Sequence, residues 1–577
     1  MKKKLSGVIA LLCATLVCGS SCSLLTEVLS KLNPSSESSV EDGTITFESV
    51  SSGFSKTMIA KEETKTVDVN KDITGKNYVK IELETNANLL GAFRYADVNN
   101  ESKVVVEEFF IEPSNEPIVF KQFLDSYRAN GVGLFDKKLL SVSFKNLDEA
   151  MAEVSVKGIS VAKRDVPKIE KEIYIEKGDL KVGADLTMGG TLSYLERTSY
   201  LDENGKKQTV DEIIDKDGNV SIGIGAATSA DCQEPLSNSV NLINIYDAGR
   251  EIQQSYYANV GGTKADTPEE VAEFGYSVNN KPDDYGSNGY DRSWCFTSDV
   301  KGYYWPYNPV QGGDEVCNVS QIIDYEITES EIWVKVRAMD WANGYAWPKY
   351  ANLPGYESVK NGRTTKSYIE NRYTIKGNML YVDNRFVDWN GFENMDKIPE
   401  HSLEIPATYI VHPLNNYVCY MGSNPWELAD ENYVRRNDLG SWVEAPEVNY
   451  NPPEEWFAWV NEDDFGVGVY IPNADVYVSG RCDASTAATY KGNKDAKTAP
   501  MANEYLYNKK APTSDYTSCY VGNTCYTAPV VTVTMKEYIP LSYSYVVAVD
   551  YLRIMRSNFK ELADAQVITN KGLEAWD

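Results

Sequence analysis

The stretch NLINIYDAGREIQQSYY, residues 241–257, is the segment on which the interpretation of this sequence depends most. Read with the period of a β-strand, Ile252 shares one face with Arg250, Gln254 and Tyr256, and the other face carries Glu251, Gln253, Ser255 and Tyr257. Neither face is apolar, so a buried strand would need hydrogen-bond partners and an exposed strand would offer a polar recognition surface. Two interpretations stay open, a solvated tyrosine-rich strand or hairpin and a carbohydrate site.

The composition limits the class of protein. A chain of 577 residues is too long for one ordinary core, so two or three domains are expected. The 39 Tyr and 11 Trp residues combine a large apolar body with a polar group. The net charge of −28 argues against nucleic acid and anionic lipid headgroups as partners. It also disfavours a highly anionic polysaccharide, unless Arg residues are concentrated locally.

The first residues indicate export. A basic segment, residues 2–4, precedes the apolar run Val8–Val17, which is shorter than the roughly 20 residues needed to span a membrane. Gly19-Ser20-Ser21 before Cys22 resembles a bacterial lipoprotein processing site, with ordinary signal cleavage as the alternative. We therefore expect a signal peptide over residues 1–21, lipid on Cys22 as the only membrane contact, and a location in the cell envelope. Whether that is the outer membrane, the surface or the periplasmic face stays open.

The strand rhythm predicts an all-β fold. After a Ser-rich tether over residues 22–43, short strands between turns predict a jelly-roll-like β-sandwich over residues 44–167. We expect this domain to brace the second one or to bind sugar. Its clearest strands are expected at residues 78–84, 103–111, 139–144 and 152–161. A large antiparallel β-sandwich is expected over residues 168–577, with a hairpin turn at 202–205.

A short helix is expected near the C-terminus. Asn558 followed by Glu561 has the spacing of a capping box, which predicts that a helix opens there and runs to about Ala565.

Two resemblances extend this interpretation. Gly189–Leu195, GGTLSYL, resembles the opening hairpin of the galactose-mutarotase-like supersandwich, in which a long curved antiparallel sheet presents a concave sugar-binding face. Together with residues 241–257, Tyr304–Asp314 (YWPYNPVQGGD) and His401–Tyr409 (HSLEIPATY), it resembles a family of secreted β-sandwich proteins of Bacteroidota and other bacteria. These are known mostly as hypothetical proteins or candidate carbohydrate-active enzymes. The resemblance implies a carbohydrate-related role over residues 170–577 and no particular reaction.

Carboxyl groups are the first candidates for chemistry, because glycoside hydrolysis usually needs two of them. The motif regions offer Asp247, Glu251, Asp314 and Glu404. For each taken singly, a turn or a salt bridge is the alternative. His401 is a further catalytic candidate, although its three-residue separation from Glu404 places the two on opposite faces of a regular strand.

Substrate contacts are expected from planar polar and aromatic side chains. The candidates are Arg250, Gln253, Gln254, Tyr256, Tyr257, Trp305, Asn308 and Gln311. Two His residues and the lack of a CxxC pair make a metal site improbable, and no cofactor is expected.

Three functions stay open. The first is a glycoside hydrolase with a carboxylate pair. The second is a polysaccharide lyase, in which Tyr256, Tyr257 or His401 would be the base and Arg250 and Gln254 would neutralise a uronate. The third is a non-catalytic glycan-binding surface lipoprotein. All three require the segments near residues 250, 310 and 404 to converge on one hollow of a bent antiparallel sheet. Glycan identity, disulfide pairing and oligomeric state cannot be read from these residues.

Overall fold

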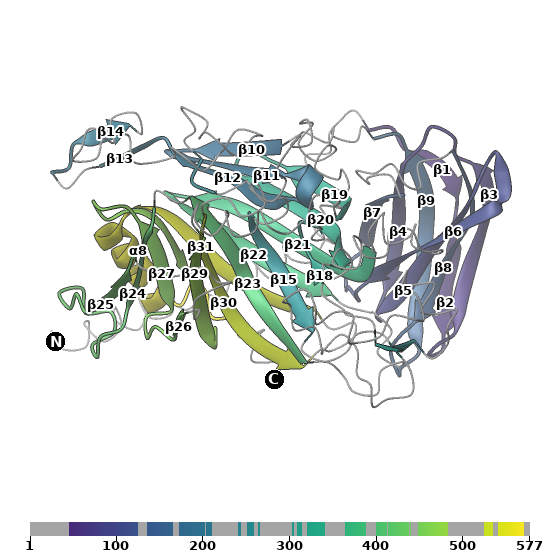
Figure 1. Ribbon diagram of the computed structural model, residues 1–577. Coiled ribbons are helices and arrows are strands. Elements are labelled where there is room, and N and C mark those ends of the chain that lie inside the picture. Colours follow the sequence, from purple (N-terminus) through teal and green to yellow (C-terminus); the bar gives the residue numbers. More distant parts are fainter. Residues whose placement is uncertain are drawn as a thin grey trace, which may run out of the picture. The chain divides into compact units, whose positions relative to one another are not determined.

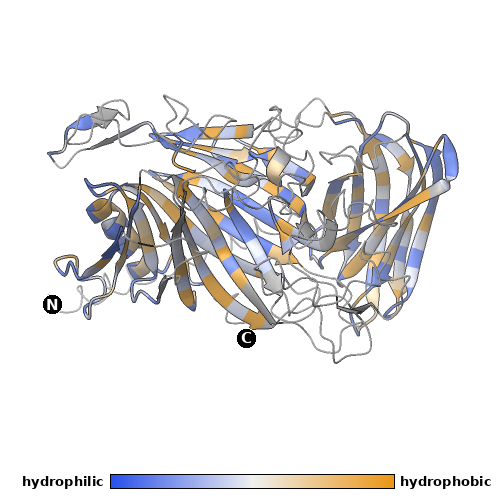
Figure 2. Cartoon of the chain, viewed as in Figure 1, coloured by the Kyte–Doolittle hydropathy of each residue, from blue (hydrophilic) through white to orange (hydrophobic). Residues whose placement is uncertain are grey.

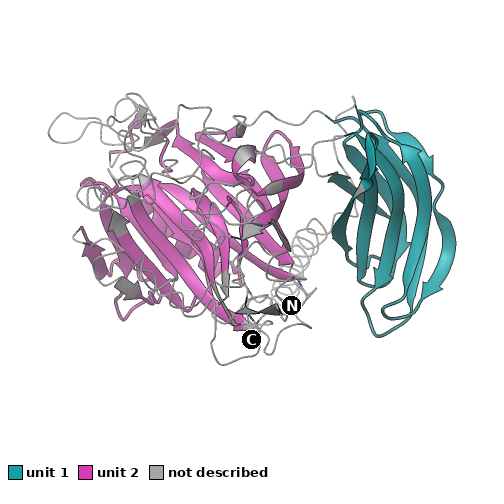
Figure 3. Cartoon of the chain, turned by 45° about the vertical axis from the view of Figure 1, so that its right-hand side comes forward, with its two compact units in different colours: residues 1–126, 133–165 teal, residues 127–132, 166–577 magenta. Residues whose placement is uncertain are grey.

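The structure is a computed structural model that describes residues 45–124, 136–164, 172–201, 204–209, 241–243, 251–258, 264–265, 303–304, 309–313, 320–340, 364–387, 400–411, 414–437, 439, 448–482, 524–534 and 540–570. The chain divides into two compact units (Figure 3). The first comprises residues 1–126 and 133–165, and the second comprises residues 127–132 and 166–577. Among the described residues, no helix is both long enough and apolar enough to cross a membrane.

The first unit contains two antiparallel sheets. One has β1 (Glu48–Ser51), β9 (Ala152–Ala162), β4 (Tyr78–Thr85) and β7 (Ile118–Phe123) in that order, with β2 (Phe54–Ile59) also on β9. The other has β3 (Thr64–Asp72), β8 (Lys137–Asn146), β5 (Leu89–Asp97) and β6 (Asn100–Ile111). All four strands expected from the sequence are confirmed, each extended by one or more residues.

Aromatic rings from both sheets form the core of the first unit. Phe109 of β6 stacks on Phe93 of β5 with ring centroids 4.4 Å apart, and on Phe120 of β7, in the other sheet, at 4.6 Å. All three side chains are buried. Alternation of buried and less buried residues along β8 and β9 places one face of each strand in this core. The first unit is therefore a β-sandwich, as expected.

The second unit is built on an 18-stranded network of antiparallel pairings. The network begins with β10 (Glu172–Lys177), β11 (Leu180–Asp185), the short 3-10 helix η1 (Leu186–Met188) and β12 (Thr191–Arg197). β15 (Ile252–Ala258) pairs with β12, with β18 (Pro309–Val310) and with β23 (Glu400–Val411), so two halves of the network meet at this strand (Figure 1).

One half continues from β18 to β20 (Glu331–Asp340), which also carries β19 (Gln321–Ile327). It then runs through β21 (Thr364–Lys376), β22 (Met379–Val387), β31 (Leu541–Tyr551), β28 (Phe465–Tyr470), β27 (Trp456–Val460), β24 (Asn416–Tyr420) and β25 (Tyr433–Arg436). The other half runs from β23 through β30 (Thr524–Thr534) and β29 (Val476–Cys482) to β26 (Val448–Tyr450).

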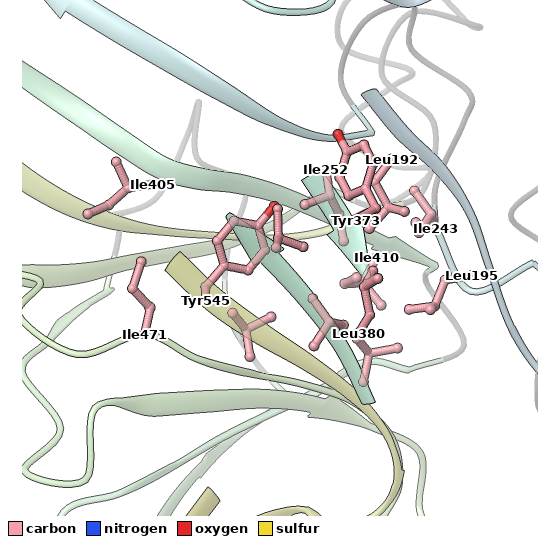
Figure 4. Packing of buried hydrophobic residues seen from close by; sticks show 14 of the residues in the cluster. Leu192, Leu195, Ile243, Ile252, Tyr373, Leu380, Ile405, Ile410, Ile471 and Tyr545 are labelled. Carbon is pink, nitrogen blue, oxygen red and sulfur yellow. The ribbon is translucent and has the colours of Figure 1, made fainter. Parts of the chain in front are cut away.

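The large apolar core lies between these halves. Leu380 and Tyr545 come from the first half, Ile405 and Ile410 from the second, and Leu192 from β12, and Figure 4 shows them gathered around one interior. Each is fully buried. Figure 2 shows apolar and polar residues alternating along the strands, as expected when one face of a sheet is buried. The expected all-β class with a large antiparallel β-sandwich is confirmed.

Three local expectations have different outcomes. The hairpin expected from the turn signal at residues 202–205 is confirmed by the antiparallel pairing of β13 (Ser199–Leu201) with β14 (Lys207–Thr209), while residues 202 and 203 lie outside the described residues. A second two-stranded pairing joins β16 (Lys264–Ala265) and β17 (Tyr303–Tyr304). The expected short C-terminal helix is confirmed as α8, which spans Leu552–Asp564. The expected capping box is wrong, because Asn558 lies inside this helix.

Tertiary contacts explain where α8 starts. It follows β31 directly, and the amide of Leu552 donates to the carbonyl of Asp464 at 2.7 Å. Its apolar stripe, which includes Met555 and Phe559, packs in one buried cluster with Trp456 of β27 on the outer side of the sheet. Packing of this stripe, rather than a local cap, therefore determines the first turn.

Candidate functional site

β15 brings the predicted segments together. Ser255 pairs with Val310 of β18 and with Glu404 of β23. Upstream, Ile243 forms an isolated antiparallel bridge with Ile410 of β23. The segments near residues 250, 310 and 404 therefore occupy adjacent strands, although they are far apart in the sequence.

The inward face of β15 is polar and fully buried. Between the two halves, amide and phenol groups from the four strands β15, β21, β22 and β31 and from the segment that follows β18 form what we call the inter-sheet network. Its members are Gln254, Tyr256, Gln311, Asn371, Tyr373, Asn384, Tyr543 and Tyr545, none more than 2% exposed. Burial raises the pKa values of its tyrosines, Tyr256 among them, well above the usual range, so these phenols stay protonated.

Gln254 and Gln311 are central to this network. The amide of Gln311 donates to the carbonyl of Gln254 at 3.0 Å, and the amide of Gln254 donates to Gln311 Oε1 at 3.3 Å. The side chain of Gln254 donates to the Tyr545 hydroxyl at 3.3 Å and accepts a hydrogen bond from the Tyr543 hydroxyl. Gln311 Nε2 donates to the Tyr373 hydroxyl at 3.4 Å. A glutamine pair thus connects β15 with the opposite strands β21 and β31.

Tyr256 completes the network at its other end. Its hydroxyl donates to Asn384 Oδ1 at 2.7 Å, and its ring stacks on Phe386 at 3.7 Å. Asn384 in turn donates to Asn371, which donates to the Tyr373 hydroxyl at 3.1 Å. Hydrogen bonds of this kind remove the cost of burying amides, and they specify how the two halves align.

The Gly189-Gly190 pair is required by the same network. Gly189 has φ +64°, and a Cβ there would lie 1.9 Å from the carbonyl oxygen of Gln311. The carbonyls of Gly189 and Gly190 accept hydrogen bonds from Gln311 Nε2 at 3.1 Å and from the Tyr373 hydroxyl at 2.9 Å. The glycines of the GGTLSYL motif therefore allow the backbone to approach closely and accept these bonds.

Glu251 and Gln253 are also buried and bonded internally. Glu251 accepts a hydrogen bond from the Thr191 hydroxyl at 3.2 Å. Burial is the main reason why the pKa of Tyr373 is raised, and the charge of Glu251 raises it further. Glu251 therefore lies close to the inter-sheet network. Gln253 Oε1 accepts the amide of Gly312 at 2.9 Å, which fixes β15 to the segment after β18.

The outward face of the same strands carries a second set of polar side chains. Ile252 and Tyr256 of β15 belong to the core, so strand alternation turns Ser255 outward. Directly paired residues of antiparallel strands share a face, which places Glu404 outward beside Ser255. Both neighbours of Glu404 in β23, Leu403 and Ile405, are core residues, which agrees with an outward Glu404 side chain.

This outward face continues from β15 to β20. Val310 pairs with Ser255 on one side and with Met339 of β20 on the other. Arg337 lies on the outward face of β20, because both of its neighbours, Val336 and Ala338, belong to the core.

It then continues across β21 and β22. Arg337 pairs with Tyr368, and Glu370, two residues further along β21, pairs with Arg385 of β22 and with Lys335 of β20. We call this row of outward polar side chains the outer band. Its members are Tyr526, Glu404, Ser255, Lys335, Arg337, Tyr368, Glu370 and Arg385.

A carboxylate and a phenol form one end of the outer band. The Tyr526 hydroxyl, on β30, donates to Glu404 Oε1. The ring of Tyr409 lies 5.0 Å from that of Tyr526. Across from Glu404, the Ser255 hydroxyl is buried and has no hydrogen-bond partner in the part of the chain that the structure describes. A buried hydroxyl without a partner is costly, and a ligand is one way to satisfy it.

Several predicted residues lie outside the described residues, namely Asp247, Arg250, Asp314, Trp305, Asn308 and Cys22. For His401 and Tyr257 the structure describes the backbone, with His401 paired to Ala258 and Val533, and Tyr257 paired to Ser402. Their assignments, and those of the buried Glu251, Gln253, Gln254, Tyr256 and Gln311, stay predictions. Among the described residues, no group of three or more His, Cys, Asp or Glu side chains is placed to hold a metal ion.

Sequence reasoning missed the cationic part of the outer band and Tyr526. A signal is present in KVRAMD, where Lys335 and Arg337 alternate with core residues of β20. Charged residues that alternate with core residues in a strand indicate a second, polar face, which is either covered by other parts of the chain or binds a ligand. Tyr526 carries no comparable signal, because its hydrogen bond to Glu404 forms only when β23 and β30 are adjacent.

No known protein family and no curated protein matches this sequence. Solved structures similar to parts of it include a mutant of a carbohydrate-binding module of family 29, with 12% identity, 21% of this chain and 93% of that chain covered, and a TM-score of 0.16. A galactose mutarotase related enzyme from Lactobacillus acidophilus has 9% identity over 66% of this chain and 97% of that chain, with a TM-score of 0.30. A 4-alpha-glucanotransferase from Thermococcus litoralis has 8% identity over 66% of this chain and 37% of its own, with a TM-score of 0.26. Scores this low assign no function to this chain.

Proposed function

We propose that this chain is an extracytoplasmic lipoprotein that degrades a glycan by hydrolysis, with its active site on the outer band around Glu404. The observation that carries the proposal is the pairing of Glu404 with the Tyr526 hydroxyl, directly across from the buried and unpartnered Ser255 hydroxyl. A carboxylate, a phenol and a free hydroxyl on one sheet face are groups that recognise and activate a sugar ring.

The hydrogen bond from Tyr526 suits one of the two roles in hydrolysis. A donor to a carboxylate favours its ionised form, which a nucleophile or general base requires. We therefore assign Glu404 that role and Tyr526 a positioning role. The general acid must then be a second carboxyl group, about 5 Å away in a retaining enzyme and roughly 6.5–9.5 Å away in an inverting one.

Spacing limits which carboxyl group can be the acid. Glu370 shares the outward face, but it is four strands from Glu404, roughly 19 Å along the sheet at about 4.8 Å per strand. Glu251 is already bonded to Thr191. Asp247 and Asp314 remain the candidates, because one lies between Ile243 and β15 and the other directly follows Gly313.

The test combines substitutions with a panel of neutral and acidic polysaccharides. Wild-type protein should release reducing ends, and Glu404→Gln should lower the rate about 10²- to 10⁴-fold, as expected for a lost acid–base or nucleophilic group. Asp247→Asn and Asp314→Asn test which of the two residues is the general acid, because only the substitution of that residue should abolish hydrolysis. Glu561→Gln, the same chemical change at an exposed position of α8, is the matched control and should keep full activity. Full turnover by Glu404→Gln would refute the assignment.

The same panel decides between the three functions. Reducing ends without ultraviolet absorbance from unsaturated ends support hydrolysis. Both signals together would replace it with elimination by a lyase. Retention of the protein in an affinity gel, with neither signal, would identify a non-catalytic glycan-binding protein.

A further inference from the structure

Two tyrosines lie beside one glycine on the outward face of β10, β11 and β12, which are neighbouring strands of the second unit (Figure 1). Gly183 of β11 pairs with Tyr174 of β10 on one side and with Tyr194 of β12 on the other. Directly paired residues share a face, and the core residues Ile175 and Leu195 next to the tyrosines face inward, so the three paired positions face away from the core. We call Tyr174, Lys181, Gly183 and Tyr194 the tyrosine platform.

The glycine allows the two rings to meet above the sheet. A Cβ at Gly183 would lie 2.7 Å from Cε1 of Tyr174 and 2.8 Å from Cβ of Tyr194, so any other residue would force the tyrosines aside. The ring centroids are 5.4 Å apart and the ring planes make an angle of 86°, an edge-to-face arrangement that aromatic pairs favour. Because Gly183 has no side chain, the two tyrosines form one continuous aromatic surface.

Polar contacts within the protein hold both rings in place. Lys181 Nζ lies 5.1 Å from the ring centroid of Tyr174 and 5.2 Å from that of Tyr194, within the range of a cation–π interaction. The Tyr194 hydroxyl donates to Glu196 Oε2 at 2.7 Å. Side chains that are already held in one conformation lose little entropy when a ligand binds, so the platform is preorganised.

The platform is open to solvent at Tyr174. This residue is 40% exposed, and it is the only exposed aromatic side chain among those whose burial the structure describes; the others are buried or half-buried. An exposed ring that is fixed on a sheet gains free energy when the apolar side of a ligand covers it.

The charges around the platform disfavour an anionic ligand. Strand alternation places Glu176, Asp185 and Glu196 on the same outward face as Lys181, so three carboxylates surround one ammonium group. A carboxylate oxygen accepts more than one hydrogen bond, so these groups are acceptors for hydroxyl donors. The surroundings therefore fit a ligand that has an apolar face and several hydroxyl groups but no negative charge.

We propose that the tyrosine platform binds a neutral sugar unit of a glycan, as a second site apart from Glu404. The C–H groups on one side of a pyranose ring form an apolar face that packs on Tyr174, and hydroxyl groups at the edge of the sugar donate to Glu176 or Glu196. The two sites are separate, because Tyr174 lies four strands from Glu404, roughly 19 Å across the sheet at about 4.8 Å per strand. This site goes beyond the proposed hydrolysis and does not depend on it.

The experiment measures, by native affinity gels, the affinity of the full chain for xyloglucan, galactomannan and laminarin, which are neutral, and for polygalacturonate. At least one neutral polysaccharide should bind, and Tyr174→Ala should lower that affinity about 5- to 20-fold, as expected for a lost aromatic contact. Tyr174→Thr, which keeps a side chain that favours strands, should have the same effect. Tyr174→Phe keeps the ring and should retain most of the affinity. In a Glu404→Gln background the effect of Tyr174→Ala should be the same, because distant sites act independently.

Ile327→Ala is the matched control, because Ile327 on β19 is exposed to a similar extent, 44%. It should leave the affinity unchanged. Binding of none of the neutral polysaccharides would overturn the proposal, and so would a folded Tyr174→Ala or Tyr174→Thr with unchanged affinity. Tighter, Tyr174-dependent binding of polygalacturonate would overturn the assignment of a neutral sugar.

Failure of this inference differs from failure of the proposed function. Binding that depends on Tyr174, without new reducing ends from any polysaccharide, would keep the platform and remove hydrolysis. Hydrolysis that depends on Glu404, with equal affinity of wild type and Tyr174→Ala, would do the opposite. If both sites act as proposed, Tyr174→Ala should raise the KM for the polysaccharide and leave kcat unchanged.

Discussion

Replacing Glu454 by Gln should strongly destabilise the second unit. Glu454 and Arg556 form a bidentate ion pair beneath α8, with Nε to Oε2 at 2.9 Å and Nη2 to Oε1 at 2.7 Å. Neither residue is more than 1% exposed. Each Glu454 oxygen also accepts one further hydrogen bond, from the Trp426 amide at 2.6 Å and from Trp456 Nε1 at 2.7 Å.

The magnitude follows from these four donors. Glutamine has only one acceptor oxygen, so its NH₂ group would face two donors, and Arg556 would lose the charge that compensates its own. Desolvation would lower the pKa of Arg556, but the hydrogen bonds to Glu454 and Tyr433 keep it above its usual value, so this cation stays charged inside. Breaking a buried ion pair on one side costs about 3–5 kcal/mol.

Urea unfolding followed by tryptophan fluorescence measures this loss in the second unit alone. All 11 Trp residues lie at or after Trp294, so the first unit contributes no tryptophan signal. With m of about 2–3 kcal/mol/M, the midpoint should fall by roughly 1–2 M. Arg435→Gln, which breaks the exposed pair with Asp464, is the control and should cost less than about 1 kcal/mol.

The double variant Glu454→Leu with Arg556→Met tests the reasoning further. It removes both charges, so it should be more stable than Glu454→Gln or Arg556→Met alone. A Glu454→Gln midpoint within about 0.3 M of wild type would show that the pair contributes little and would refute the argument.

Three further outcomes are expected. Gly189→Ala should cost at least about 2 kcal/mol in the same assay, because its Cβ would meet a carbonyl oxygen at 1.9 Å, whereas Gly377→Ala, with positive φ but nothing within 4 Å, should cost about 1 kcal/mol. Tyr256→Phe should cost roughly 1–3 kcal/mol by leaving Asn384 Oδ1 without its donor, and an unchanged midpoint would contradict that role. Burial raises the pKa of Asp550, so the contribution of Asp550 to stability falls as pH rises from about 4 toward neutrality. Asp550→Asn should therefore make stability depend less on pH in this range. An unchanged pH dependence would contradict this role of Asp550.

Local pattern was enough to predict four of the nine strands described in the first unit, namely β4, β6, β8 and β9. The alternation in AEVSVKGISV, for example, needs only neighbouring residues, and β9 covers it from Ala152 to Ala162. The hairpin turn ending at Gly205 is equally local. The capping box at Asn558 was also a local prediction, and it is wrong because the apolar stripe of α8 packs against distant strands from Leu552 onward.

Only part of the candidate site could be predicted from the sequence. The sequence by itself determined the strand period, the turns and the unusual polarity of residues 241–257, because these depend on neighbours along the chain. It could not determine that Gln254 faces a buried network, or that Ser255 lies between Val310 and Glu404. A strand with two polar faces has no apolar side to orient it, so only the strands that pair with it decide which face is buried. Those partners come from segments far away in the chain, and the tertiary structure alone brings them together.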